Sequence, residues 1–133
     1  MENHVPHLAP QHSFLIQVVV IGNTIHRTVI DEGASTCIMS ISCWKSLDSS
    51  PLNQSPNTLE AFDGRGFHPY GILNALPIHL EGKIVNMEVK FFDVPVNYNL
   101  LLGLSWKNVM VCVVSTLFRM LLFPHQGKVF TVN

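Results

Sequence analysis

The chain has 133 residues, enough for one domain with a sizeable buried core. Hydrophobic residues make up 47% of it and charged residues only 13%, with a formal net charge of −1. Because so little charge keeps copies apart, this composition indicates a buried partner surface. The eight Lys and Arg residues are scattered singly, which argues against the adjacent phosphate contacts of a nucleic-acid-binding surface.

Cysteine and histidine usage argues against a metal site. Cys37, Cys43 and Cys112 are odd in number and lack the spacing of metal ligands, which favours free buried thiols in a reducing compartment over disulfides. The histidines cluster only within the polar segment 1–13, where no Cys or carboxylate ligand accompanies them. We therefore expect neither a metal nor a cofactor.

The segment 1–13 also lacks the basic start and long apolar core of a signal peptide. The longest later apolar stretch, Val109 to Phe123, is interrupted by Ser, Thr and Arg. We expect a disordered tail over 1–13, a domain over 14–133, no membrane contact and an intracellular, cytoplasmic location.

The first predicted elements form a hairpin. Phe14 to Ile21 and Thr24 to Ile30 are β-favouring runs, and Gly22-Asn23 between them has turn composition. The second run ends at Asp31. Next along the chain, Cys37 to Leu47 predicts a short strand and a helical turn.

The middle of the chain alternates loop and strand signals. Asp48 to Asn57 carries Ser and Pro residues typical of a surface loop, and Leu59 to Phe62 predicts a strand. Asp63 to Gly71 holds three glycines and a proline between apolar runs, which predicts a hairpin tip that could close over a cleft. An ordinary exposed hairpin is the alternative.

The second half predicts a further hairpin from Ile72 to Val94 with its turn at Glu81-Gly82, then an apolar run into Gly103. A short helix and three strands are expected in the rest, at Leu104 to Val109, Val111 to Ser115, Leu117 to Phe123 and Lys128 to Val132, with a turn at Pro124 to Gly127. Many short strands with few helices predict an all-β domain, either a small closed barrel or a sandwich.

One motif contains a candidate catalytic residue. Asp31-Glu32-Gly33-Ala34-Ser35 follows an apolar strand directly, so the strand delivers an acid into a turn whose Gly lets substrate backbone approach. Asp-x-Gly is also common in ordinary turns. The second half echoes the pattern in Leu101-Leu102-Gly103, without an acid.

These residues resemble the retropepsins, the homodimeric aspartic proteases of retroviruses and long-terminal-repeat retrotransposons, and most closely those of plant gypsy-type elements. The likeness covers Phe14 to Asn133. It rests on segments in a shared order, namely Val29-Ile30-Asp31-x-Gly33-Ala34-Ser35, Phe62-Asp63-Gly64 with Pro69-Tyr70-Gly71, Leu76-Pro77-Ile78 and Tyr98-Asn99-Leu100-Leu101-Leu102-Gly103-x-x-Trp106.

The resemblance implies a small closed, barrel-like acid protease fold with one short helix and one active-site half per chain. It implies a homodimer in which two Asp31 carboxylates act together, with Gly33 beside each, on an extended peptide or polyprotein. The implied substrate-binding residues are Ala34, Gly64, Phe67, Tyr70 and Gly71. The segment around Gly64 to Gly71 would be the flap, which closes over the substrate. Phe67 and Tyr70 could equally be packing residues that anchor this flap.

The chain differs from the family pattern at two places, so its activity stays open, although an aspartic endopeptidase is favoured. The family has Ser or Thr where this chain has Glu32, so Glu32 must protonate, turn outward or loosen the dimer. Leu104-Ser105 stands where relatives often have Arg-Pro. The alternatives are an inactive peptide-binding or dimerisation module derived from such a protease, and a monomeric decayed fragment.

Overall fold

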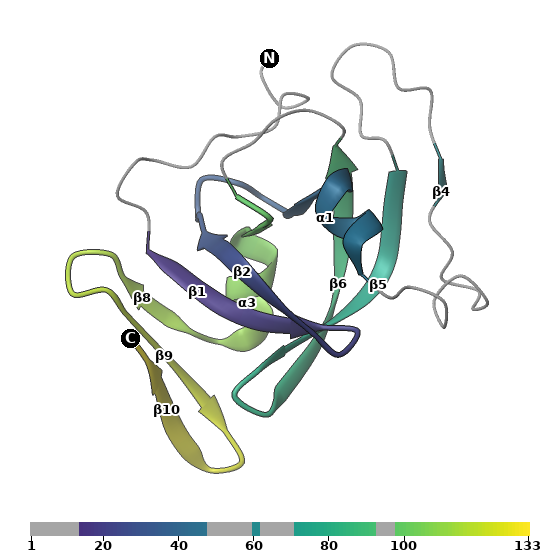
Figure 1. Cartoon of the computed structure of the whole chain (residues 1–133). Helices are drawn as coiled ribbons and strands as arrows, with labels where there is room; N and C mark the ends of the chain where they lie inside the picture. Colours follow the sequence, from purple (N-terminus) through teal and green to yellow (C-terminus); the bar gives the residue numbers. More distant parts are fainter. Residues whose placement is uncertain (1–13, 48–59, 62–70, 93–97) are drawn as a thin grey trace.

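The computed structural model describes residues 14–47, 60–61, 71–92 and 98–133 (Figure 1). Within these ranges the chain is built mainly of short strands, with two short helices. The elements are β1 (Leu15–Val20), β2 (Asn23–Ile30), β3 (Cys37–Ser40), α1 (Ile41–Ser46), β4 (Glu60–Ala61), β5 (Gly71–Leu80), β6 (Lys83–Phe92), β7 (Leu100–Leu102), α3 (Leu104–Met110), β8 (Val113–Ser115), β9 (Met120–His125) and β10 (Lys128–Val132).

Six strands close into a barrel. Their order is β1-β2-β7-β3-β6-β5, and a pairing of β1 with β5, at Val19 and His79, completes the ring. The short strand β4 adds to β5 outside the ring. Closure leaves the ring without free strand edges. The all-β closed barrel expected from the sequence is thus confirmed, and the sandwich is not found.

Three two-residue turns set the register of the hairpins. Ile21 and Gly22, Glu81 and Gly82, and Gln126 and Gly127 all have positive φ angles, the conformation that matches the twist of paired strands. The first turn lies one residue earlier than predicted, because Asn23 already pairs with Val20 in the ladder. The last turn is shorter than predicted, since Pro124 and His125 remain in β9.

The central strand β7 joins the two halves of the barrel. It runs parallel to β2, with Ile30 opposite Leu102, and antiparallel to β3. All three β7 leucines are buried, as expected for a continuous apolar run between two neighbours. This pairing carries Gly103 to the same end of the barrel as Asp31.

The two short helices lie where the sequence predicts a short helix and a helical turn. α3 occupies the predicted segment, and α1 is a second helix directly after β3. α1 begins because the Ser40 side chain accepts a hydrogen bond from the Cys43 backbone N–H at 3.2 Å, an N-cap. No helix in the described ranges is long and apolar enough to cross a membrane.

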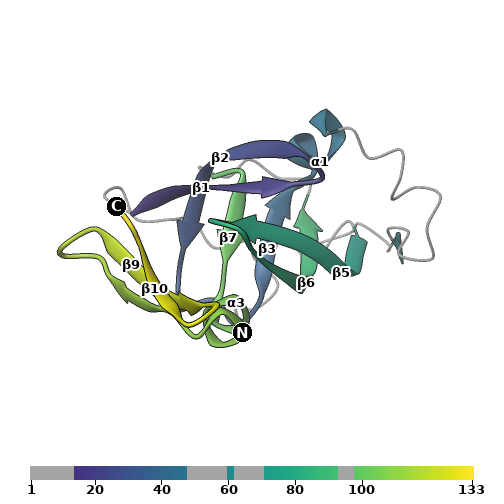
Figure 2. The ribbon, with the colours of Figure 1, turned by 90° about the horizontal axis from the view of Figure 1, so that it is seen from below.

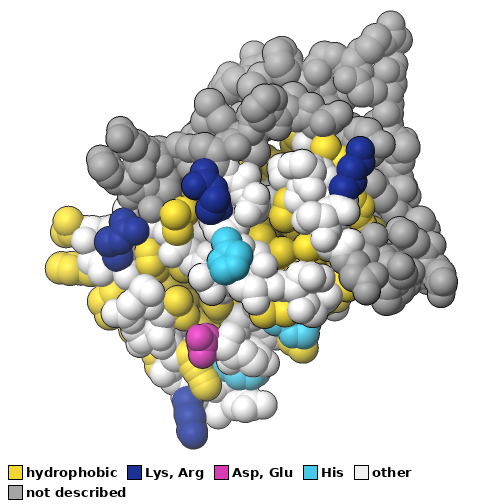
Figure 3. Space-filling view, viewed as in Figure 1, with side chains coloured by type: hydrophobic (Ala, Val, Ile, Leu, Met, Phe, Trp, Pro, Cys, Tyr) yellow, Lys and Arg dark blue, Asp and Glu magenta, His cyan; other side chains and the backbone are white. Residues whose placement is uncertain are grey.

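A three-stranded sheet, β8-β9-β10, lies beside the barrel next to α3 (Figure 2). β9 begins three residues later than predicted, because Phe118 N–H donates to Ser115 Oγ and Arg119 N–H to Thr116 O, which makes this segment a turn. Leu117 and Phe118 in that turn are largely exposed. Hydrophobic side chains gather there at the edge of the face in Figure 3.

The core fills the barrel and extends under α3 and β9, with Trp106, Met110 and Phe123 almost fully buried. A second, smaller group of buried side chains packs beside the loop that follows β2, with Ala34 against it. We call it the small cluster; its members are Val29, Ile38, Phe92, Tyr98 and Leu101.

Candidate active site

The loop that follows β2 presents Asp31 at one end of the barrel. Asp31 N–H donates to Leu102 O at 3.0 Å, which continues the parallel pairing of β2 with β7 by one residue. Ala34 N–H then donates to Asp31 O at 3.1 Å and closes a turn. The backbone of Asp31 is therefore fixed on both sides.

The Asp31 carboxylate is held by its own loop. Its Oδ1 atom accepts a hydrogen bond of 2.8 Å from Gly33 N–H, and its Oδ2 atom is buried. A Cβ atom at Gly33 would lie 3.1 Å from Oδ1, closer than nine in ten real contacts of this kind. Glycine at position 33 thus lets the loop fold tightly around the acid, while its own backbone stays exposed.

The two residues after Gly103 bind this loop to the start of α3. Leu104 N–H donates to Ala34 O at 2.7 Å, and Ser105 N–H donates to Ser35 O at 3.1 Å. These bonds use carbonyl groups of the loop and the first amides of the helix, which have no partner inside a helix. The echo of the first motif in the second half of the sequence therefore corresponds to a direct backbone contact.

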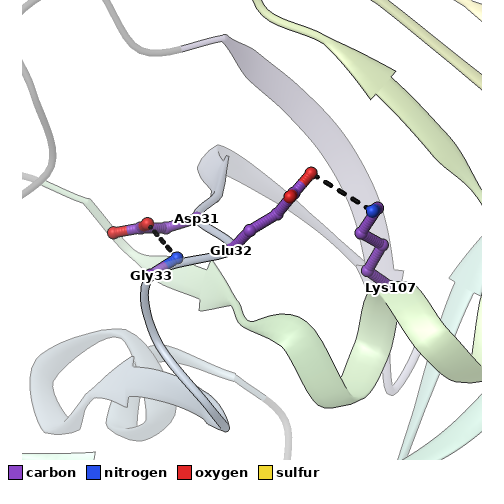
Figure 4. Close-up of polar contacts among 4 residues, drawn as sticks. All are labelled: Asp31, Glu32, Gly33 and Lys107. Carbon is purple, nitrogen blue, oxygen red and sulfur yellow. Dashed lines mark hydrogen bonds and ion pairs between the residues drawn. The ribbon is translucent and has the colours of Figure 1, made fainter.

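Glu32 turns outward. Its carboxylate oxygen Oε2 lies 3.4 Å from the Lys107 ammonium on α3, and the Glu32 side chain is 49% exposed. Figure 4 shows the Asp31 and Glu32 carboxylates on opposite sides of the loop backbone. Of the three outcomes that the sequence leaves open for Glu32, this single chain shows the outward one.

Tyr98 is a residue near the site that the sequence analysis did not select for a role. Its hydroxyl is buried in the small cluster and has no hydrogen-bond partner among the described residues. Burial, with a smaller contribution from the Asp31 charge, raises the pKa of Tyr98 to about 12. Its sequence signal is its place as the first residue of the Tyr98 to Trp106 segment on which the resemblance partly rests.

A buried thiol lies under the same loop. Cys37, at the start of β3, is fully buried, and burial raises its pKa to about 11. All three cysteines are free thiols. Within the described ranges, no group of three or more His, Cys, Asp or Glu side chains is placed to hold a metal ion.

The predicted site residues are only partly brought together. Asp31, Gly33 and Ala34 share one loop, and Ala34 packs against the small cluster. Gly71 begins β5, where it pairs with Ala61 and Phe91. Gly64, Phe67 and Tyr70 lie outside the described residues, as do the predicted loop 48–57 and most of the predicted flap.

Comparison with known proteins supports the fold. No protein-family model matches the chain, and no curated protein matches it. Among solved structures, the retroviral protease-like domain of Ddi1 from Leishmania major matches with a TM-score of 0.64 and 14% identity over 96% of both chains. EIAV protease in complex with the inhibitor HBY-793 matches with a TM-score of 0.53 and 14% identity, over 80% of this chain and 95% of that one.

Both structures are proteases or protease-like domains of the retroviral type, although both identities are too low to transfer a function. The likeness extends over nearly the whole chain in the first case. It agrees with the closed barrel. The chain therefore has a retropepsin-like, aspartic protease-like fold.

Proposed function

We propose that the chain is an aspartic endopeptidase domain that acts as a homodimer on extended peptides. The observation that carries this proposal is the Asp31 loop, in which a backbone amide orients one carboxylate at the end of a retropepsin-like barrel. Peptide hydrolysis needs one group that activates a water and a second group that protonates the scissile carbonyl, so two acidic groups are required. Glu32, the nearest acid in sequence, points away, so a second Asp31 from a partner chain supplies the other group.

In such a dimer the two Asp31 carboxylates share one proton, because like charges in close contact cannot both ionise, and the pair titrates as a unit. The ionised carboxylate accepts a proton from the attacking water, and the protonated one donates to the carbonyl oxygen of the peptide. Gly33 and Ala34 lie next to the acid and line the approach of the substrate backbone.

The finer assignments belong to the same proposal. The substrate is a polyprotein of a plant gypsy-type retrotransposon, the domain spans residues 14–133, and the location is cytoplasmic. The segment from Gly64 to Gly71, with Phe67 and Tyr70, forms the flap over the substrate. Support for these points comes from the sequence motifs and the retropepsin-like fold.

The test compares the parent with Asp31→Asn on a pool of apolar peptides, with and without a statine-type inhibitor. Asn keeps the shape of Asp but cannot act as the shared acid and base, so cleavage should fall by roughly 10⁴-fold or more. Glu88→Gln, which removes an exposed carboxylate from β6, is the matched control and should cleave like the parent. Equal rates for Asp31→Asn and the parent would refute the proposed chemistry.

A second candidate is a peptide-binding or dimerisation module without catalysis. It is favoured by Glu32, because position 32 then carries no hydroxyl that could bond across a dimer beneath the two acids. Glu32→Ser distinguishes the two functions. A gain of cleavage supports the protease scaffold, whereas a folded dimer that binds the inhibitor without cleaving supports the binding module.

A further inference from the structure

We propose that Lys107 is a positioning residue for the active-site loop: its ammonium holds the Glu32 carboxylate on the outer side of the loop, away from Asp31. This inference rests on the proposed function for its catalytic consequence and on the ion pair for its geometry. The two carboxylates belong to adjacent residues, yet they lie on opposite sides of the backbone, and the Lys107 ammonium stands on the Glu32 side (Figure 4).

The backbone explains why Lys107 can reach Glu32. The bonds from Leu104 N–H to Ala34 O and from Ser105 N–H to Ser35 O fix the first turn of α3 on the active-site loop. Lys107 lies one turn further along this helix, and its backbone N–H donates to Gly103 O at 3.2 Å. Its side chain is only 26% exposed, so its stem packs along the protein and its ammonium is directed to a limited region.

The surroundings of the ion pair agree with this placement. Cys112, after the end of α3, is buried, and burial raises the pKa of its thiol. Lys107 and Lys83 lower that pKa and Glu32 raises it, so all three charges lie within electrostatic range of the same thiol. The Asp31 charge instead contributes to the raised pKa of the Tyr98 hydroxyl. The Lys107 and Glu32 charges thus both act on the Cys112 thiol, and the Asp31 charge acts on Tyr98.

Loss of the Lys107 charge should lower the rate of cleavage. Without the Lys107 ammonium, Glu32 loses its ion pair on the outer side, and its conformers toward Asp31 become more populated. A carboxylate near the Asp31 pair disfavours the ionised form that activates water. An exposed ion pair changes such a population by about two- to fivefold per chain. Because the dimer holds two copies, we expect cleavage by Lys107→Met to fall by roughly tenfold.

Four variants separate this role from simple packing. Lys107→Arg keeps the charge and should retain cleavage within about twofold of the parent. Glu32→Gln/Lys107→Met has no carboxylate left to hold, so it should cleave like Glu32→Gln alone. A merely structural Lys107 would instead cause the same loss in both backgrounds. Lys128→Met removes an exposed lysine from β10 and should leave cleavage unchanged.

A second readout does not depend on catalysis. The Gly33 amide donates to Asp31 Oδ1, so its ¹H–¹⁵N NMR resonance reports charge near Asp31. The resonance should move in Lys107→Met and return to the Glu32→Gln position in the double variant. If no variant cleaves but the resonance moves in this way, the protease proposal fails and the role of Lys107 stands. A Gly33 resonance identical in the parent and Lys107→Met, or a loss of cleavage that persists in the double variant, overturns the inference.

Discussion

A side chain on Gly103 would collide with the carbonyl oxygen of Thr36, because the turn before α3 packs directly on the backbone of the active-site loop. A Cβ atom there would also lie 2.7 Å from Ala34 O, and backbone cannot move aside as a flexible side chain can. Two hydrogen bonds next to this contact fix Ala34 and Ser35. Gly103 thus controls the position of the loop that carries Asp31.

Gly103→Ala is therefore expected to lower the free energy of unfolding by about 1–3 kcal/mol and to reduce any Asp31-dependent cleavage more than this loss explains. Urea denaturation and peptide cleavage measure the two effects. Gly82→Asn is the control, since a Cβ atom at that turn meets nothing within 4 Å and Asn tolerates positive φ. A fully stable and active Gly103→Ala variant would show that the loop is not held by this contact.

Lys83 fastens the three-stranded sheet to the barrel. Its ammonium donates to Met110 O at 2.9 Å, at the end of α3, and to Pro124 O at 3.0 Å, in β9. Because these carbonyl groups lose their donor, Lys83→Met should cost about 1–2 kcal/mol of stability, measured by urea denaturation. Lys90→Met in the same strand is the comparison and should cost less. Equal losses for both variants would contradict the bridging role.

The buried Tyr98 hydroxyl has no hydrogen-bond partner among the described residues, so its removal should not destabilise the fold. We expect Tyr98→Phe to unfold at the same urea concentration as the parent at pH 7, or to be more stable by up to about 1 kcal/mol. Thermal unfolding of both proteins checks this. A loss above about 1 kcal/mol would reveal a hydrogen bond of the hydroxyl in solution.

The same residue makes stability depend on alkaline pH. Its pKa is about 12 in the folded chain against an ordinary value of 10.0, so between these values the unfolded chain releases the proton and the folded chain keeps it. The stabilisation is fully present below pH 10 and is lost as the pH rises toward 12. Unfolding at pH 9 and pH 11 should therefore show a smaller loss for Tyr98→Phe than for the parent. Identical losses would contradict the raised pKa.

Thiol reactivity should differ sharply between Cys37 and Cys43. Cys37 is fully buried with a pKa of about 11, whereas Cys43 is only partly buried, although burial also raises its pKa. Iodoacetamide reacts with the thiolate, so at pH 8 it should modify Cys43 first. Peptide mass spectrometry of native and urea-unfolded protein identifies the site. Equal rates in the native protein would contradict the buried position of Cys37.

The sequence by itself determined the local structure. Alternating or continuous apolar runs placed the strands, and a Gly in each two-residue turn placed the hairpins, because both signals act within a few residues. It also placed Asp31 and Gly33 in one loop, since adjacent residues cannot separate. The first turn shifted by one residue because cross-strand pairing at Asn23, a contact between two strands, fixed the register.

Only the tertiary structure decided how these pieces meet. Closure of the barrel depends on the pairing of β1 with β5, which no local pattern encodes. The contact of Gly103 with the Asp31 loop and the outward ion pair of Glu32 with Lys107 join residues far apart in the sequence. Glu32 alone allowed three outcomes, and α3 favours the outward one, because it places the Lys107 ammonium 3.4 Å from the outward carboxylate.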